Sequence, residues 1–365
     1  MRLLLGGRVL LVTLLAVAFF ALAALPAGAT VSGTNGKILY GQVFPNYGVT
    51  INPDGSNPIP IGPIDSTTCN TWSPDSSKVL CNLWSPDGVP QPATANPDGS
   101  GFTLLNPNLP LDLFCLNWSH PTGSRLLCHS EGMANPAAAG LYTVRSSDAG
   151  DLERVSTTLP GGFDDGYGYS PDGSRILYAQ FDSNDHATLF SVKPDGSDPV
   201  QLSPPELSII DLGFFDRAGA DWSPDGSHVA FAAQKLSSRS FISAVFVVNA
   251  DGTGLRQITP SGVGGISAQW SPNGEMIAFT SCCSLPQAWV VHPDGSGLRQ
   301  VTTPINRATF LTPVWSPDSS KLLLDKVDRN NQASVWTTNL DGSGLLKLAD
   351  TPQPSILDWG SAPAD

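Results

Sequence analysis

The stretch DWSPDGSHVAFA, residues 221–232, joins a tryptophan to a Ser-Pro-Asp-Gly sequence and then to an alternating run that ends in apolar residues. Pro224 presets the backbone φ angle for a tight turn, and Gly226 accepts the left-handed conformation that such a turn needs. The stretch therefore predicts a strand that ends at Trp222, a turn, and a second strand over residues 228–232.

The same pattern recurs at five further places: TWSPDSSKVLC from Thr71, NWSHPTGSRLLC from Asn117, GYSPDGSRILYA from Gly168, QWSPNGEMIAFT from Gln269 and VWSPDSSKLLLD from Val314. Its aromatic residues are Trp72, Trp118, Tyr169, Trp222, Trp270 and Trp315, at spacings of 46, 51, 53, 48 and 45 residues. A period of about 40–50 residues with several short strands per unit is typical of a β-propeller. The tryptophan and the turn therefore belong to the scaffold, and we expect the aromatic rings to pack between neighbouring sheets.

A second motif lies between these copies: INPDGS at Ile51, ANPDGSG at Ala95, VKPDGSD at Val192, NADGTGLRQIT at Asn249, VHPDGSGLRQVT at Val291 and NLDGSGLLKLA at Asn339, with a degenerate seventh copy from Val144. Together the two motifs predict four antiparallel strands per unit, called A to D here. In the fifth unit, strand A ends at Trp222, and strands B, C and D cover residues 228–232, 244–249 and 255–259.

The two ends of the repeat region complement each other. NGKILYG at Asn35 matches strand B with no strand A before it, and ILDWGS at Ile356 matches strand A with no strand B after it. Trp359 follows Trp315 by 44 residues, in phase with the repeat. We therefore predict an all-β fold: a single seven-bladed β-propeller of four-stranded antiparallel blades, closed by the C-terminal strand joining the first blade. Six blades are the alternative, because the second blade is irregular.

The repeat WSPDGS…IAF…DGSGLRQIT resembles the WD-like repeat of TolB-family β-propellers, over residues 35–360. Similar repeats form the propellers of prolyl-oligopeptidase-type peptidases and of some carbohydrate lyases, so the resemblance implies a fold rather than one function. TolB proteins carry a further N-terminal α/β domain. Only a few residues separate Ala29 from the first strand here, so we expect a propeller-only member with one TolB-like domain over residues 30–365.

The N-terminus reads as an export signal. Arg2 and Arg8 precede an apolar run over residues 9–25, and Ala27, Gly28 and Ala29 form an A-x-A cleavage sequence. This is typical of a secretory signal peptide, residues 1–29, whereas a membrane anchor needs a longer run. We therefore expect an extracytoplasmic protein, whether secreted, periplasmic or on the cell surface, without a transmembrane segment after cleavage.

The charge balance limits the class of partner. Cleavage removes two arginines and no acidic residue, leaving 17 Lys+Arg against 32 Asp+Glu and a net charge of −15. Such a surface repels phosphate backbones, which argues against nucleic acid. Many aspartates fall in turn motifs, and the D-x-D-x-D-G spacing of a calcium loop is absent. We expect a monomer with a protein or glycan ligand, no metal and no cofactor.

Six cysteines in an exported chain indicate disulfide bonds. Cys69 and Cys115 each precede a repeat tryptophan by three residues, and Cys81 and Cys128 lie at the matching end of the next strand. We predict Cys69–Cys81 and Cys115–Cys128, each worth about 2–3 kcal/mol. For the neighbours Cys282 and Cys283, a vicinal disulfide and two free thiols both remain open.

Function is expected on one face of the ring. The A–B and C–D turns are short and uniform, whereas the B–C and D–A connections vary and share the other face, the variable face. Loops on a rigid ring commonly carry binding residues, and aromatic and arginine side chains are typical anchors. The candidate contacts are Trp84, Asp164, Asp165, Tyr167, Phe214, Phe215, Asp216, Arg217, Arg239, Arg307 and Arg329.

Two enzyme classes compete with a binding role. The peptidase resemblance implies a separate α/β-hydrolase domain, but no G-x-S-x-G sequence for its nucleophile is present. The lyase resemblance implies a histidine-rich metal centre, but the histidines do not converge on one site: His120, His129, His186, His228 and His292. Asp164 and Asp165 are a weak candidate pair for acid–base catalysis. We therefore expect a non-catalytic binding propeller, with a polysaccharide lyase or glycosidase as the alternative.

Overall fold

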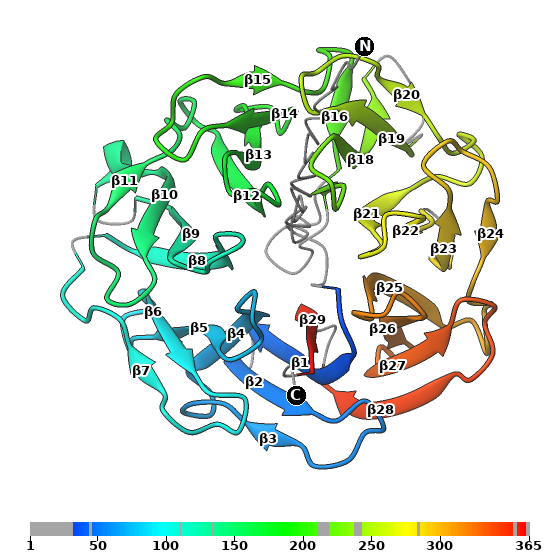
Figure 1. Ribbon diagram of the computed structural model, residues 1–365, viewed down its shortest axis with the longest axis horizontal. Helices are drawn as coiled ribbons and strands as arrows, with labels where there is room; N and C mark the ends of the chain where they lie inside the picture. The colour runs from blue at the N-terminus through cyan, green and yellow to red at the C-terminus, as the bar shows by residue number, and fades with distance from the viewer. Residues whose placement is uncertain are drawn as a thin grey trace, which may run out of the picture.

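The computed structural model describes residues 32–43, 46–109, 111–132, 135–210, 219–236, 243–282, 285–352 and 356–362. In these residues, seven antiparallel sheets stand around a central axis (Figure 1). The predicted all-β, seven-bladed propeller is confirmed, and the six-bladed alternative is wrong. The described part contains one helical element, the 3-10 turn η1 (Pro136–Ala138), and no helix in it is long and apolar enough to cross a membrane.

The first four blades each have four strands. Blade 1 comprises β29 (Ile356–Ser361), β1 (Asn35–Val43), β2 (Asn46–Ile51) and β3 (Ile59–Pro60), and blade 2 comprises β4 (Thr67–Trp72), β5 (Val79–Trp84), β6 (Pro90–Ala95) and β7 (Thr103–Leu104). Blade 3 comprises β8 (Leu113–Trp118), β9 (Arg125–Ser130), β10 (Gly140–Arg145) and β11 (Glu153–Arg154), and blade 4 comprises β12 (Phe163–Tyr169), β13 (Ile176–Phe181), β14 (Ala187–Val192) and β15 (Val200–Gln201).

The last three blades follow the same plan with one variation. Blade 5 comprises β16 (Leu207–Ile209), β17 (Ala220–Trp222), β18 (His228–Lys235), β19 (Ser243–Asn249) and β20 (Arg256–Gln257). Blade 6 comprises β21 (Ile266–Trp270), β22 (Ile277–Thr280), β23 (Ala288–Val291) and β24 (Arg299–Gln300), and blade 7 comprises β25 (Thr309–Trp315), β26 (Lys321–Val327), β27 (Ala333–Asn339) and β28 (Leu346–Thr351).

Some inner strands begin earlier than predicted. Residues 203–220 fall in the D–A connection before blade 5, for which the repeat pattern predicts one long loop, but β16 lies inside that segment and pairs with β18, as β17 does. Likewise β12 begins at Phe163 and β25 at Thr309, inside segments expected to be loops. These stretches contain Gly, Asp and Pro, which disfavour strands, and their pairing with a neighbouring strand overrides that preference.

The ring closes as predicted. Strand β29 pairs antiparallel with β1, with Trp359 opposite Ile38 and Leu357 opposite Tyr40 (Figure 1). Blade 1 is thus built from both ends of the propeller region. The pairing completes the four-stranded sheet of blade 1 and closes the ring between the first and last blades.

Each repeat aromatic residue packs against the preceding blade. Seven buried apolar clusters each span two neighbouring sheets. Trp315 of blade 7, for example, packs with Ala278 and Val290 of blade 6, and Trp359 of blade 1 packs with Leu323 of blade 7. The prediction that these rings lie between sheets is confirmed, and the core is a ring of interfaces rather than one central mass.

Polar side chains also join the inner strands of neighbouring blades. The Asp221 carboxylate accepts the backbone N–H of Trp270 at 2.9 Å, and the Asp358 carboxylate accepts the N–H of Trp72 at 2.9 Å. Each aspartate directly precedes a repeat tryptophan. The Asp-Trp pair therefore serves both kinds of contact: the ring packs on the preceding blade, and the carboxylate binds the following one.

The turn aspartates have the structural role that was expected of them. Asp225 accepts hydrogen bonds from the Ser223 and Ser227 hydroxyls at 2.6 and 2.7 Å and from the Ser227 N–H at 3.0 Å. These bonds lower the pKa of the Asp225 carboxyl against the opposing effect of partial burial. Asp75, Asp172 and Asp318 make the same contacts in their own A–B turns.

Two disulfide bonds close the first hairpins of blades 2 and 3. Cys69–Cys81 and Cys115–Cys128 are formed as predicted, and in each pair the cysteines are direct partners across the inner and second strands. All four cysteines are fully buried. Cys282 is disulfide-bonded, but Cys283 lies outside the described residues, so the vicinal bond stays a prediction.

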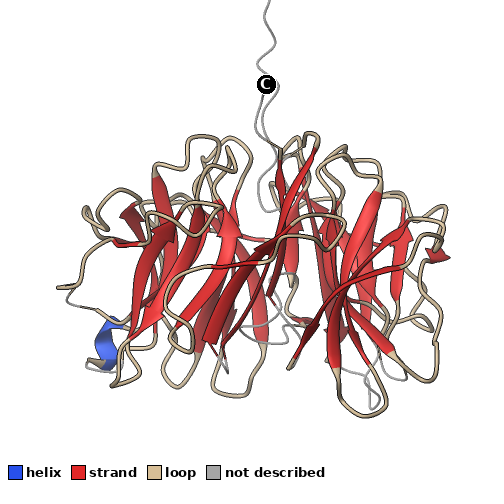
Figure 2. Ribbon diagram, turned by 90° about the horizontal axis from the view of Figure 1, so that it is seen from below, coloured by secondary structure: helices blue, strands red, loops and turns tan. Residues whose placement is uncertain are grey.

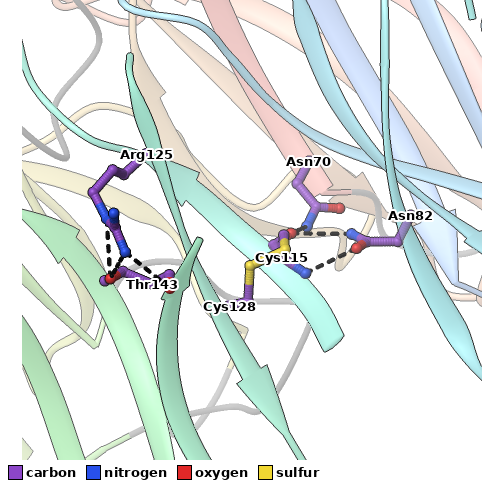
Figure 3. The surroundings of a disulfide bond; sticks show 6 residues. All are labelled: Asn70, Asn82, Cys115, Arg125, Cys128 and Thr143. Carbon is purple, nitrogen blue, oxygen red and sulfur yellow. Dashed lines mark hydrogen bonds between the residues drawn. A yellow bond between two sulfur atoms is a disulfide. The ribbon is translucent and has the colours of Figure 1, made fainter. Parts of the chain in front are cut away.

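A buried amide network surrounds the second disulfide (Figure 3). The Asn82 side chain accepts the Cys115 N–H at 2.8 Å and donates to the Cys115 carbonyl at 3.0 Å. The Asn70 amide donates to the same carbonyl at 2.8 Å. Because both asparagines belong to blade 2 and Cys115 to blade 3, these bonds join two blades at the inner strand.

Candidate binding face

The variable face carries most of the exposed apolar side chains. It is formed by the B–C and D–A connections and bears η1, the blue element in Figure 2. Among the described residues, nine large apolar side chains are exposed. Six lie on this face: Ile64, Leu159, Phe163, Leu236, Leu285 and Ile305. The other three lie toward the opposite face: Leu152 and Leu255 in C–D turns, and Leu346 at the start of β28, directly after such a turn.

Trp84 is a half-buried aromatic residue at one corner of this face. It ends β5, and its indole Nε1–H donates to the Thr68 hydroxyl at 3.1 Å. Beside it lies a groove of about 670 Å³, lined by Pro63, Asp65, Ser66, Leu83, Trp84, Ser85, Pro86, Gly88 and Gln91. Trp84 is the candidate contact from the sequence that lines a groove in the described part of the chain.

An aromatic contact chain leads inward from Trp84. The ring centroids of Trp84 and Phe114 are 5.7 Å apart, and those of Phe114 and His129 are 5.6 Å apart. Burial lowers the pKa of His129 to about 4, against the opposing effect of the Asp112 carboxylate. His129 is therefore neutral at physiological pH and supports the aromatic chain as an uncharged ring.

Asp164, Asp165 and Tyr167 were expected in a loop, and the structure corrects this. All three lie on strand β12, where Asp164 and Tyr167 are buried. The Asp164 carboxylate accepts from Ser156 at 2.6 Å, Thr158 at 3.1 Å and Gln180 at 3.2 Å. Burial raises its pKa, while these bonds act in the opposite direction.

The buried side chains of Asp164 and Tyr167 therefore have structural roles. Asp164 braces the D–A connection of blade 4, and Tyr167 packs in the interface between blades 4 and 5. Asp165 faces the opposite side of the strand and is half-buried. Adjacent strand residues point to opposite faces, so the two carboxyls do not form a catalytic pair.

The arginine candidates are distributed around the ring. Arg307 is exposed in the D–A connection before blade 7, and Arg329 is exposed in the B–C turn of the same blade. The remaining candidates lie outside the described residues: Phe214, Phe215, Asp216, Arg217 and Arg239. Their contact role stays a prediction.

An exposed apolar cluster lies on blade 4 and was not predicted from the sequence. Phe163 is 49% exposed, and its ring stacks on that of Phe181 with centroids 4.0 Å apart. Leu159, also exposed, precedes it in the D–A connection. Phe163 directly precedes the candidates Asp164 and Asp165, but sequence alternation alone does not say which end of a strand reaches solvent.

A metal centre has no ligand set in the described part of the chain. No group of three or more His, Cys, Asp or Glu side chains there is arranged to hold a metal ion. The described histidines are spread over four blades, with His129 on β9, His228 on β18 and His292 after β23 as examples.

Comparisons with known proteins agree with this architecture. Residues 216–357 match the family model of the TolB beta propeller domain. TolB from Acinetobacter baumannii is 15% identical, with 91% of this chain and 68% of that chain covered and a TM-score of 0.54. An oligogalacturonate lyase from Vibrio parahaemolyticus is 15% identical, with 87% of each chain covered and a TM-score of 0.57.

A third similar structure is the β-propeller domain of the Trilobed protease from Pyrococcus furiosus, which is 12% identical, with 91% of this chain and 98% of that chain covered and a TM-score of 0.60. No curated protein matches the chain in sequence. At these identities the similar structures show a shared fold and not a shared activity. The resemblance that the repeats carry is confirmed: residues 216–357 match the family model of the TolB beta propeller domain, and the described residues form a seven-bladed β-propeller.

Proposed function

We propose that this protein is an exported, monomeric and non-catalytic β-propeller that binds a protein partner outside the cytoplasm through its variable face. The observation that carries the proposal is the uneven distribution of exposed large apolar side chains among the described residues, with six on the variable face and three on the opposite face. Exposed apolar groups that gather on one face of a soluble protein commonly mark an interaction surface.

The rigid propeller scaffold supports a binding role. Buried disulfides and inter-blade hydrogen bonds hold the loops on a rigid ring, which reduces the conformational entropy lost on binding. The disulfides also favour an oxidising compartment, in agreement with the signal peptide expected over residues 1–29. Sequencing of the exported chain is expected to begin at Thr30.

The alternative, a carbohydrate-active enzyme, has less support. Asp164, a buried carboxyl at the variable face, is held by three neighbouring side chains and braces a loop. Turnover of oligogalacturonate or another polysaccharide by the purified protein would contradict the non-catalytic proposal.

The test compares two matched triple variants. Phe163→Ser, Leu236→Ser and Ile305→Ser remove apolar side chains from the variable face, whereas Leu152→Ser, Leu255→Ser and Leu346→Ser remove three comparably exposed ones from the opposite face. Residues 30–365 of each are used in crosslinking capture from extracytoplasmic material. We expect a partner protein that the wild type and the opposite-face variant capture and the variable-face variant loses.

Equal capture by all three proteins would contradict a variable-face site. Both variants alter exposed side chains, so their thermal midpoints should stay close to that of the wild type. Gel filtration of the same samples checks the monomeric state.

A further inference from the structure

One copy of the turn motif lies on the variable face, whereas the scaffold copies lie on the opposite face. The sequence WSPDG occurs at residues 84–88 in the B–C turn of blade 2, whereas the scaffold copies lie in A–B turns. The turn itself is formed, since Gly88 N–H donates to the Ser85 carbonyl and Ser85 N–H donates to the Val89 carbonyl, both at 2.9 Å. Its tryptophan, however, is half-exposed instead of buried between sheets.

Trp84 is held in one orientation. Its backbone N–H donates to the Ser66 carbonyl at 2.7 Å, its indole N–H donates to Thr68, and Phe114 packs beside its ring. The indole therefore has no free hydrogen-bond donor to offer. What it presents to the groove is a fixed apolar ring surface.

The walls of the groove are mostly apolar. Pro63 and Leu83 form them together with Trp84 and Pro86, and Ile64 beside the groove is 68% exposed. Two of the polar side chains there are engaged in their own turns: Ser66 donates to the Pro63 carbonyl at 3.4 Å, and Ser85 accepts the Val89 N–H at 3.0 Å. A sugar ring needs several hydrogen bonds to its hydroxyls, so this lining favours an apolar occupant.

The charged residues at the groove are acidic. Asp65 lines it and Asp87 lies between two lining residues, and both carboxylates are exposed. None of the nine lining residues is a lysine or arginine. The complementary ligand is therefore cationic as well as apolar.

We propose that the groove beside Trp84 is a docking site for an extended, proline-containing peptide segment with a neighbouring lysine or arginine. A proline ring lies flat on the indole, and the cationic side chain pairs with Asp65 or Asp87. Proline-rich segments are already extended before binding, so they lose little entropy on an aromatic-lined groove. The inference rests on the proposed function, because the segment belongs to the partner protein.

The probes are fluorescein-labelled eight-residue peptides that permute two prolines, one leucine and two arginines in a glycine background. Charge-reversed peptides carry glutamate for arginine, and proline-free peptides carry alanine. Fluorescence anisotropy with residues 30–365 is expected to show binding of the first set only. Raising the salt concentration should weaken binding, because exposed charges are screened.

Matched variants locate the binding. Trp84→Ala is expected to raise Kd about tenfold or more, and Trp84→Phe, which keeps an aromatic ring, much less. Trp336→Ala is the control, since Trp336 is also half-buried with its Nε1–H bonded to a hydroxyl, that of Ser334 at 2.8 Å. Asp65→Asn with Asp87→Asn should weaken binding and reduce its salt dependence, whereas Asp185→Asn with Glu206→Gln changes net charge equally and should leave both unchanged.

Three results would overturn the groove assignment: no binding of any cationic proline peptide, binding that Trp84→Ala leaves unchanged in a folded protein, or binding of a neutral oligosaccharide that Trp84→Ala abolishes. Circular dichroism and the thermal midpoint establish that each variant is folded. The face as a whole is judged separately. If partner capture depends on Phe163, Leu236 and Ile305 while the peptides fail, the proposed function stands and only this groove is wrong.

Discussion

Asn82 illustrates how single polar side chains hold the blades together. It is fully buried on β5, and its amide both donates to and accepts from the backbone of Cys115 on the next blade (Figure 3). The arrangement imitates one step of a β-ladder across a blade interface. Buried backbone groups need such partners because water does not reach them.

We predict that Asn82→Ala lowers the free energy of unfolding by about 2–3 kcal/mol, because the Cys115 N–H is left buried without an acceptor. Urea denaturation with an unchanged m-value measures the change. Asn249→Ala is the control, since Asn249 makes its amide bond to Thr253 on the exposed surface. A loss no greater than that of the control would show that the inter-blade bonds contribute little.

The aspartates in the hairpin turns share one position and one electrostatic property. Each occupies an A–B or C–D turn, and their carboxyls have a lowered pKa: Asp54, Asp75, Asp98, Asp172, Asp195, Asp225, Asp251, Asp294, Asp318 and Asp341. Blade 6 has Asn273 at the A–B position, and its amide oxygen accepts the Ser271 hydroxyl at 2.7 Å. The hydrogen bonds therefore do not require a charge.

This predicts a loss of stability in acid. A carboxyl with a lower pKa in the folded state than its unfolded value of 3.8 stabilises the fold fully above that value, and the contribution is lost as the pH falls through the folded pKa. Asp164, whose pKa is raised, contributes in the opposite sense. We expect the free energy of unfolding to fall progressively between about pH 5 and pH 2, as measured by urea denaturation.

A triple variant tests the cause of this acid dependence. Asp172→Asn, Asp225→Asn and Asp318→Asn retain the acceptor that Asn273 provides in blade 6 and remove three titrating groups. The variant should lose less stability in acid than the wild type. The same acid dependence in both proteins would place its origin elsewhere.

At the scale of the whole molecule, the ring depends on β29. This strand supplies the inner edge of blade 1, Trp359 is buried against blade 7, and its indole N–H donates to the Gly36 carbonyl at 3.1 Å. Asp358 meanwhile binds the backbone of Trp72 in blade 2. A six-residue strand thus joins the first blade, the second blade and the last.

We predict that truncation after residue 355 abolishes cooperative unfolding or soluble yield, because it opens the ring and exposes two blade interfaces. Trp359→Ala, which keeps the strand, should lower the free energy of unfolding by about 3–5 kcal/mol. Truncation after residue 362 is the control and should leave the thermal midpoint unchanged. A stable, cooperative protein ending at residue 355 would contradict closure by β29.

The repeats predict the fold from the sequence alone. Turn residues such as Pro224 and Gly226 act within a few residues of themselves, and the tryptophan period counts the blades. Cys69 and Cys81 were paired correctly because both lie at the same end of a short hairpin, and a register shift between Cys69 and Thr71 brings them directly opposite each other. These properties depend on local chemistry repeated at a constant interval, so one sequence is enough to determine them.

The candidate site was predicted much less well. Asp164 and Tyr167 were expected at the surface, but neighbouring strands and blades bury them, and Phe163 one residue earlier is left exposed. The difference between Trp84 and the scaffold tryptophans likewise depends on which face of the ring their turns occupy. The sequence by itself thus determined the blades, their number, the closure and two disulfides. Only the tertiary structure decided which loop residues reach solvent, because burial depends on side chains that blades distant in the sequence bring together.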